Sequence, residues 1–284
     1  MCMGFGCNAA GVIGCRIIDS PREKLISIIT NAFVPCNGRF PFLITIAMIF
    51  FAGELSSGFA SVVSTLAVMV VVLIGIMLTF SISSILSKTI LKGVSSSFIL
   101  ELPPYRKPQI GKILFRSIFD RTLFVLARAI SVAAPAGIVI WIMANLQISD
   151  ISLLTYVANF LDPFAKLMGL DGYILTAFIL GFPANEIVLP IILMCYMQTG
   201  VLVDMENTQS IGKILIENGW TWLTAINTMI FTLLHFPCST TTLSIKKESG
   251  SWKWAGIAFA LPTVIGIAFC MITTFVAHMF AYIT

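Results

Sequence analysis

Charge is what this sequence has least of. Only 11% of its 284 residues are Asp, Glu, Lys or Arg, whereas soluble domains carry about 25%. Hydrophobic residues make up 58%, and the mean hydropathy is +0.98. This composition excludes an ordinary soluble domain and a disordered chain. It predicts an all-α, polytopic membrane protein, because helices satisfy their own backbone hydrogen bonds in a bilayer.

The motifs of common enzymes are also missing. There is no Walker motif, no Gly-rich dinucleotide loop, no His-Glu-x-x-His and no Ser-His-Asp order. We therefore expect neither catalysis nor a permanently bound cofactor. The seven cysteines are odd in number and are not densely spaced, which argues against a disulfide framework. The net charge of +4 lies in short loops between apolar runs, so it indicates topology and not a nucleic-acid surface.

Long apolar runs dominate what remains. At about 20 residues per crossing, they predict about six crossings, over residues 40–54, 58–87, 122–147, 173–198, 221–242 and 254–283. The polar stretch 88–121 separates the second and third runs and contains three prolines. Its second half has apolar residues at helical spacing, namely Ile110, Ile113, Leu114 and Ile118. We predict a cytoplasmic linker with an amphipathic interfacial helix, and a water-soluble helix is the alternative.

Loop charges predict which segments share a side of the membrane. Segments 16–39, 88–121 and 243–253 carry +2, +5 and +2, whereas 148–172 and 199–220 carry −2 each. The positive segments should be cytoplasmic and the negative ones external. The two negative segments fall on one side although the apolar run 173–198 lies between them. That run should therefore enter and leave by the same face.

A break inside this run supports the same conclusion. Gly181-Phe182-Pro183-Ala184-Asn185-Glu186 divides it into halves that are each too short to cross a core of about 30 Å at about 1.5 Å per residue. We predict a re-entrant hairpin with its tip at depth, since irregular backbone survives there only when it is buried in protein or lines a wet cavity.

An internal repeat relates the two halves of the chain. Gly4-Phe5-Gly6-Cys7-Asn8 matches the 181–185 break at Gly, Phe and Asn, and Phe33-Val34-Pro35-Cys36-Asn37 shares Pro-Cys with His235-Phe236-Pro237-Cys238-Ser239. The segments that follow the two Gly-Phe motifs are predicted on opposite sides, which is typical of inverted repeats. We predict three parts: 1–87, a first gate-like repeat that is incomplete at its N-terminus, with a transmembrane hairpin; 88–121, the linker; and 122–284, a transmembrane helix, the second gate-like repeat and a C-terminal helix.

The strongest candidate site residues lie at these breaks. Glu186 follows a Gly-Pro break at expected depth, where a carboxylate usually marks an ion or proton path; the alternative is a carboxylate held by backbone N–H groups at a half-helix start. Cys36 and Cys238 each follow a proline that frees a backbone carbonyl, so a thiolate and an oxygen acceptor coincide. Such ligands suit Fe²⁺, Zn²⁺ or Cu⁺ better than Mg²⁺ or Ca²⁺, although a buried cysteine is often a packing residue.

Further candidates are weaker. Cys7 and Asn8 belong to the first break, and Asn185 belongs to the equivalent one. His235 precedes Cys238 by three residues, but Pro237 intervenes, and a structural histidine is the alternative. The Ser239 hydroxyl could line a path or pack between helices.

Several of these motifs resemble the C-terminal membrane region of the bacterial ferrous iron transport protein B family, which carries paired gate or nucleoside-recognition-type repeats. The resemblance rests on 4–8, 181–187, 236–238 and Ile245 to Trp254. It implies Fe²⁺ transport across the bacterial cytoplasmic membrane, with Cys7, Cys36 and Cys238 as gate cysteines and Glu186 in the second gate.

The same resemblance raises questions about partners. Family members also carry an N-terminal GTP-binding domain, a spacer and further transmembrane helices. Besides the lipid bilayer, we therefore expect a separate GTP-binding subunit or N-terminal fragment as a partner. GTP would act only through that partner. A homo-oligomer is left open. Two other functions also stay open: a permease for a nucleoside or another divalent metal, and a non-transporting membrane assembly protein.

Overall fold

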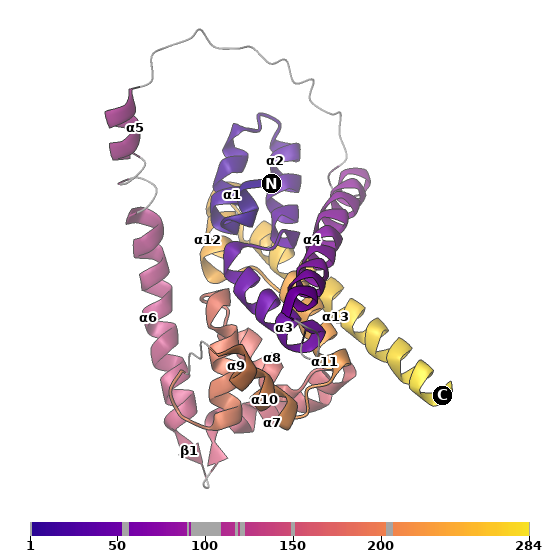
Figure 1. Cartoon of the computed structure of the whole chain (residues 1–284). Coiled ribbons are helices and arrows are strands. Elements are labelled where there is room, and N and C mark those ends of the chain that lie inside the picture. Colours follow the sequence, from indigo (N-terminus) through magenta and orange to yellow (C-terminus); the bar gives the residue numbers. More distant parts are fainter. Residues whose placement is uncertain are drawn as a thin grey trace.

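The computed structural model describes residues 2–52, 57–89, 91, 109–116, 119, 123–148, 151–202 and 207–283. The regular elements are helices, apart from one antiparallel pair of two-residue strands, β1 (Gln147–Ile148) and β2 (Ile151–Ser152) (Figure 1). The predicted helical fold is confirmed. Three segments are long and apolar enough to cross a membrane, Pro21–Phe51, Phe59–Lys88 and Trp252–Phe280. A pair bent by 109° would make a fourth, and the remaining apolar runs of the described chain are shorter or broken, so six whole crossings are not seen.

The first half contains one broken span. Helix α1 (Asn8–Gly14) precedes α2 (Pro21–Thr30), which begins where the Ser20 side chain accepts a hydrogen bond from the Glu23 N–H. Two 3₁₀ turns, Asn31–Phe33 and Asn37–Arg39, then flank an extended stretch before α3 (Phe40–Ala52). Pro35 lies in this stretch and has no N–H to continue a helix, so the span breaks there. Helix α4 (Ser57–Lys88) follows.

Helices α5 (Ile110–Arg116) and α6 (Phe124–Asn145) come next. Much of the predicted linker 88–121 lies outside the described residues, and α5 covers the start of the helix expected there. In Figure 1, α6 runs alongside the body of the molecule. Ile130, Ile138 and Trp141 on this helix are exposed, as expected of a helix that faces lipid.

The segment 148–172, predicted as an external loop, is largely helical. Helix α7 (Leu153–Leu167) is bent by 109° onto α8 (Gly172–Leu180), with Leu154, Ala158 and Ala165 buried. These three positions recur at helical spacing, so the sequence pattern indicates a helix here, although the loop charges led to the prediction of a loop. The other predicted external loop, 199–220, similarly contains α10 (Thr208–Glu217).

A helical hairpin lies where the re-entrant hairpin is predicted, and its re-entry into a membrane stays a prediction. Helix α8 is followed by the break and by α9 (Val188–Met197). The Tyr196 hydroxyl, near the end of α9, donates to the Asp171 carboxylate that caps α8. Trp220 Nε1 donates to the Tyr196 hydroxyl at 2.7 Å, and Asn145 Nδ2 donates to Gly200 O at 2.8 Å. The flanking segments therefore meet at one end of the molecule, as the loop charges predicted.

A second broken span runs in the opposite direction. The predicted apolar run 221–242 is interrupted: α11 (Trp222–Leu234) ends before Pro237, and α12 (Ser239–Ser249) extends into the segment predicted as the loop 243–253. Arg16 and Glu248 form an ion pair at 2.5 Å between the α1 end and the α12 end, and this bond raises the pKa of Arg16. At the other end, Phe51 of α3 packs on Trp222 of α11 with ring centroids 5.0 Å apart. The span α2–α3 thus runs antiparallel to α11–α12, and α13 (Trp252–Ile283) completes the described chain.

Candidate ion path at the helix breaks

Four irregular segments lie close together where the helices break. We name them the first Gly-Phe break (4–7), the first Pro-Cys break (34–36), the second Gly-Phe break (181–184) and the second Pro-Cys break (235–238). In the first half, Asn37 N donates to Gly6 O at 3.3 Å. In the second half, Ser239 N donates to Phe182 O at 2.9 Å, and Ser239 Oγ donates to Pro183 O at 3.2 Å. Each Pro-Cys break therefore lies against the Gly-Phe break of its own half.

The matched motifs share backbone conformation as well as letters. Cys7 has φ −152° and ψ 123°, and its counterpart Ala184 has φ −152° and ψ 122°. Cys36 has φ −86° and ψ 166°, and Cys238 has φ −59° and ψ 161°. The next residues, Asn8 and Asn185 in the Gly-Phe pair, are buried and begin helical segments.

A hydrogen-bonded chain links the two halves. Asn185 Nδ2 donates to the buried Cys36 Sγ at 3.8 Å, and Asn185 Oδ1 lies 3.2 Å from His235 Nε2. His235 Nδ1 lies 2.9 Å from Thr232 O, and a neutral imidazole has one N–H, which donates either to this oxygen or to Asn185 Oδ1. This hydrogen-bonded series contains three residues named from the sequence, Cys36, Asn185 and His235. The His235 side chain is buried.

The remaining candidates surround this chain. Cys238 is half-buried, with its Sγ 3.2 Å from Thr241 Oγ1. Cys7 is exposed, and Cys7 and Cys36 both lie near enough to Cys238 to interact with it electrostatically. The Glu186 side chain is exposed, and its Oε1 lies 3.0 Å from where a Cβ on Gly38 would stand. Glu186 therefore extends from the hairpin tip toward the first Pro-Cys break.

These groups do not form a closed coordination sphere. Within the described ranges, no three His, Cys, Asp or Glu side chains are grouped so that they could hold a metal ion. The arrangement offers separate thiol, amide and imidazole groups beside backbone carbonyls at the breaks. Chemically, it can offer a passing cation weak and successive contacts, which conduction requires.

Arg39 is buried, although the loop charges predict that it lies in a cytoplasmic segment. The loop count assigned it to the cytoplasmic segment 16–39, yet its side chain is 0% exposed. Its Nη1 donates to Leu233 O at 2.9 Å and Ala32 O at 3.4 Å, and its Nη2 donates to His235 O at 3.0 Å and Phe236 O at 3.2 Å. The one available signal was its position three residues after Cys36, directly before an apolar run.

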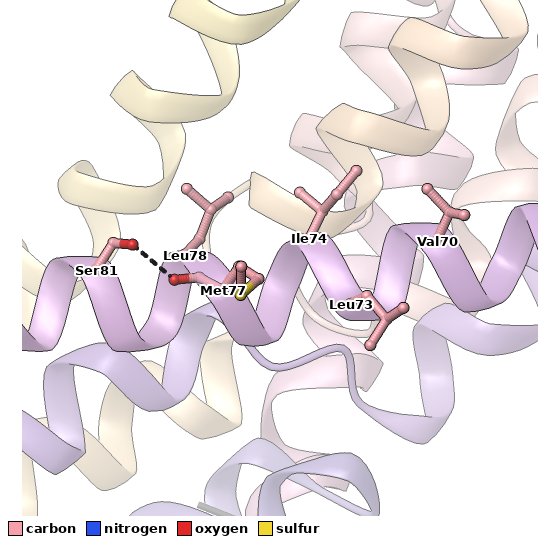
Figure 2. Close-up of a pocket in the computed structure, with 6 residues that line it drawn as sticks. All are labelled: Val70, Leu73, Ile74, Met77, Leu78 and Ser81. Atoms are coloured by element: carbon pink, nitrogen blue, oxygen red, sulfur yellow. Dashed lines mark hydrogen bonds between the residues drawn. The ribbon is translucent and has the colours of Figure 1, made fainter.

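An apolar hollow on α4 lies outside this site. Figure 2 shows its lining along one helix, with Ser81 Oγ donating to Met77 O at 2.8 Å. Leu73 and Met77 in this lining are exposed, so the hollow belongs to the surface that lipid would cover. Elsewhere on α4, Gly75 allows a close approach to the first Pro-Cys break, since a Cβ there would stand 3.0 Å from Phe33 O.

The fold and the breaks define a class: a multi-pass helical membrane protein with gate-type interrupted helices. Residues 126–252 match the family model described as "Gate: Nucleoside recognition". Residues 68–120 match the one described as "Ferrous iron transport protein B C terminus". The chain belongs to the FeoB family and corresponds to its membrane region.

Curated relatives agree along nearly the whole chain. It is 31% identical over 289 residues to the Fe(2+) transporter FeoB of Staphylococcus aureus (strain COL), covering 99% of this chain and 40% of that protein. The corresponding transporter of Methanocaldococcus jannaschii is 26% identical over 98% of this chain and 41% of its own length. This chain thus spans about two fifths of the relatives that it matches. No solved structure matches it significantly.

Proposed function

We propose that this chain forms the ion-conducting part of an Fe²⁺ transporter in the bacterial cytoplasmic membrane. The observation that carries the proposal is the meeting of both Pro-Cys breaks with the hairpin tip, joined through Cys36, Asn185 and His235. Fe²⁺ would exchange part of its water for Cys7, Cys36 and Cys238 sulfur, Glu186 oxygen and the carbonyl oxygens freed at the breaks. Mixed sulfur and oxygen contacts suit this borderline-soft ion. Asn8 and Ser239 position the backbone of the two halves.

The proposed mechanism uses an inverted pair of gates. The antiparallel course of α2–α3 and α11–α12, and the equal backbone angles at Cys7 and Ala184, support such a pair. In transporters built this way, broken helices meet near the membrane midplane, and one repeat moves against the other. Movement of the two Pro-Cys breaks relative to each other would open the path.

We further propose that this movement depends on GTP through a domain outside this sequence. The FeoB relatives are more than twice as long as the matched region, and a GTP-binding partner or N-terminal fragment would supply the drive. The description of the matching gate model favours a nucleoside as the second candidate substrate.

Uptake measurements test the proposal. Fe²⁺ accumulation would be followed in an iron-uptake-deficient bacterium that expresses this chain with and without a separately expressed GTP-binding fragment. We expect accumulation with the fragment, competition by other divalent metals and no competition by nucleosides. Nucleoside competition without Fe²⁺ accumulation would instead favour the second candidate, and no uptake of either, with protein in the membrane, would favour a non-transporting role.

Cysteine variants test the path itself. Replacing Cys36 or Cys238 by Ser should lower Fe²⁺ uptake about 10- to 100-fold, as loss of a group that orients or binds a metal does. Glu186→Gln should act in the same direction. Cys270→Ser is the matched control, because Cys270 is also buried but donates to Asn227 O at 3.4 Å in the α11–α13 contact. Unchanged uptake in both the Cys36 and the Cys238 variants would reject the path.

A further inference from the structure

Arg39 is a buried cation with unusual partners. A guanidinium removed from water normally needs a carboxylate, because burial of an unpaired charge is costly. Within the described ranges, no Asp or Glu forms an ion pair with Arg39. Its terminal nitrogens instead donate to four backbone carbonyls, and its Nε has no partner.

The four carbonyl oxygens come from both broken spans. Ala32 O belongs to the turn before the first Pro-Cys break, whereas Leu233, His235 and Phe236 provide oxygens at the second break. These last oxygens are free because α11 ends at Leu234 and Pro237 has no N–H. Converging carbonyl oxygens at a helix break are a cation site in chemical terms. Here a side chain of the protein fills it.

The filled site lies on the proposed route. Arg39 stands three residues after Cys36, and its Nη2 donates to the carbonyls of His235 and Phe236, just before Cys238, so the guanidinium lies beside the gate thiols. A fixed positive charge at that position repels a mobile divalent cation, and the repulsion is strong where water is excluded. It also holds the end of α11 against the first half.

We propose that Arg39 is a tethered cation that occupies a carbonyl-lined cation site between the two Pro-Cys breaks and closes the path. A divalent ion passes only after the guanidinium leaves the carbonyls of Leu233, His235 and Phe236. This inference rests on the proposed function for the identity of the path. Arg39 thereby keeps the resting chain impermeable to cations without any GTP-binding partner.

Passive influx into liposomes measures this tightness. The purified chain would be reconstituted with an entrapped metal-sensitive dye, and Fe²⁺ would be added under reducing conditions. Arg39→Gln keeps hydrogen-bond donors and removes the charge, so influx should rise about tenfold over the unmodified chain. Arg39→Lys keeps the charge and should stay close to the unmodified chain. Arg22→Gln is the matched control, because Arg22 also donates to backbone oxygens, of Ser87 at 3.0 Å and of Leu91, away from the breaks.

Each result decides the proposal. Size-exclusion profile and helical circular dichroism would verify that every variant is folded. A folded Arg39→Gln chain without increased influx overturns the proposal, as does equal leakage in the Lys or Arg22 variants. Arg39→Met is the second neutral variant. If both neutral variants fail to fold while Arg39→Lys folds, the charge is structural and the proposal is wrong.

A combined variant separates this inference from the proposed function. Arg39→Gln influx should fall again when Cys36→Ser is added. Influx that persists in the double variant would keep Arg39 as the barrier and reject the thiols as the path.

Discussion

At the two Pro-Cys breaks, Cys36 and Cys238 have nearly the same ψ angle, but the side chains around them differ. Three residues after Cys36 stands the buried Arg39, whereas Thr241 stands three residues after Cys238 and contacts its sulfur. Phe33 in the first half corresponds to His235 in the second. Bonds between the halves run from Cys36 and Arg39 to the second break and its surroundings. The prolines thus interrupt the helix in the same way at both breaks, while the neighbouring side chains give each break its own chemistry.

The Gly-Phe breaks differ in the same way. Cys7 and Ala184 share a conformation, yet only the first has a thiol, and that thiol is exposed. The second break is reached through α8, which is itself bent against α7. No such bent pair is found in the described part of the first half.

The largest expected effect comes from disturbing that bend. A Cβ on Gly172 would stand 2.0 Å from Ala158 O, a backbone atom that cannot move aside cheaply. Gly172→Ala should therefore lower the free energy of unfolding by about 3 kcal/mol, measured by thermal unfolding in detergent. The control is Gly137→Ala in α6, where a Cβ would meet nothing within 4 Å. Equal stability of the two variants would show that the α7–α8 contact yields easily.

The second effect separates the two buried asparagines. Asn185 joins Cys36 to His235. Asn8 bonds only within its own half: with its amide N placed where it faces acceptors, it donates to Val34 O at 3.2 Å and Gly4 O at 3.1 Å. Alanine at either position should cost about 1–3 kcal/mol, because buried partners are left unpaired. Fe²⁺ uptake per folded molecule should fall about tenfold in Asn185→Ala and change little in Asn8→Ala. Equal losses of uptake would mean that both amides only support the fold.

The smallest effect concerns the contact between the halves at the α12 end. Arg16 is 55% exposed in its ion pair with Glu248, so solvent screens much of the attraction. Arg16→Ala should lower the free energy of unfolding by at most about 1 kcal/mol, and the difference should shrink as salt is added. Thermal unfolding at two salt concentrations measures it. A larger loss that salt does not change would assign Arg16 a packing role instead.

The sequence predicted the backbone features better than the positions of charges. Pro35, Pro237 and the Gly-Phe motifs act locally, so the helix breaks and the helical hairpin could be predicted from the sequence. The order of charged loops also predicted that the 148–172 and 199–220 segments share an end. The helices inside those loops were missed because a charge count does not distinguish an amphipathic helix from a coil.

Arg39 and Glu186 show why the rest was out of reach. Arg39 precedes an apolar run, as a flanking residue would, and its burial depends on carbonyls almost 200 residues away. Glu186 follows a break expected at depth, yet its side chain is exposed beside Gly38. Both outcomes depend on how the halves pack, which no local pattern encodes. The roles of Cys7, Cys36, Glu186 and Cys238 stay predictions.

Most hydroxyl groups within the helices bond to their own helix. Thr79 donates to Gly75 O at 2.7 Å, Thr232 to Thr228 O at 2.6 Å and Thr263 to Phe259 O at 2.7 Å, each satisfying the hydroxyl one turn back. Such hydroxyls add no directional bond to a neighbouring helix, and the bonds between helices come from other side chains, such as Asn227 of α11, which bonds Thr273 and Thr274 of α13. A shift of one helix against another therefore breaks few hydrogen bonds, except where a side chain such as Asn227 or Arg39 joins two segments.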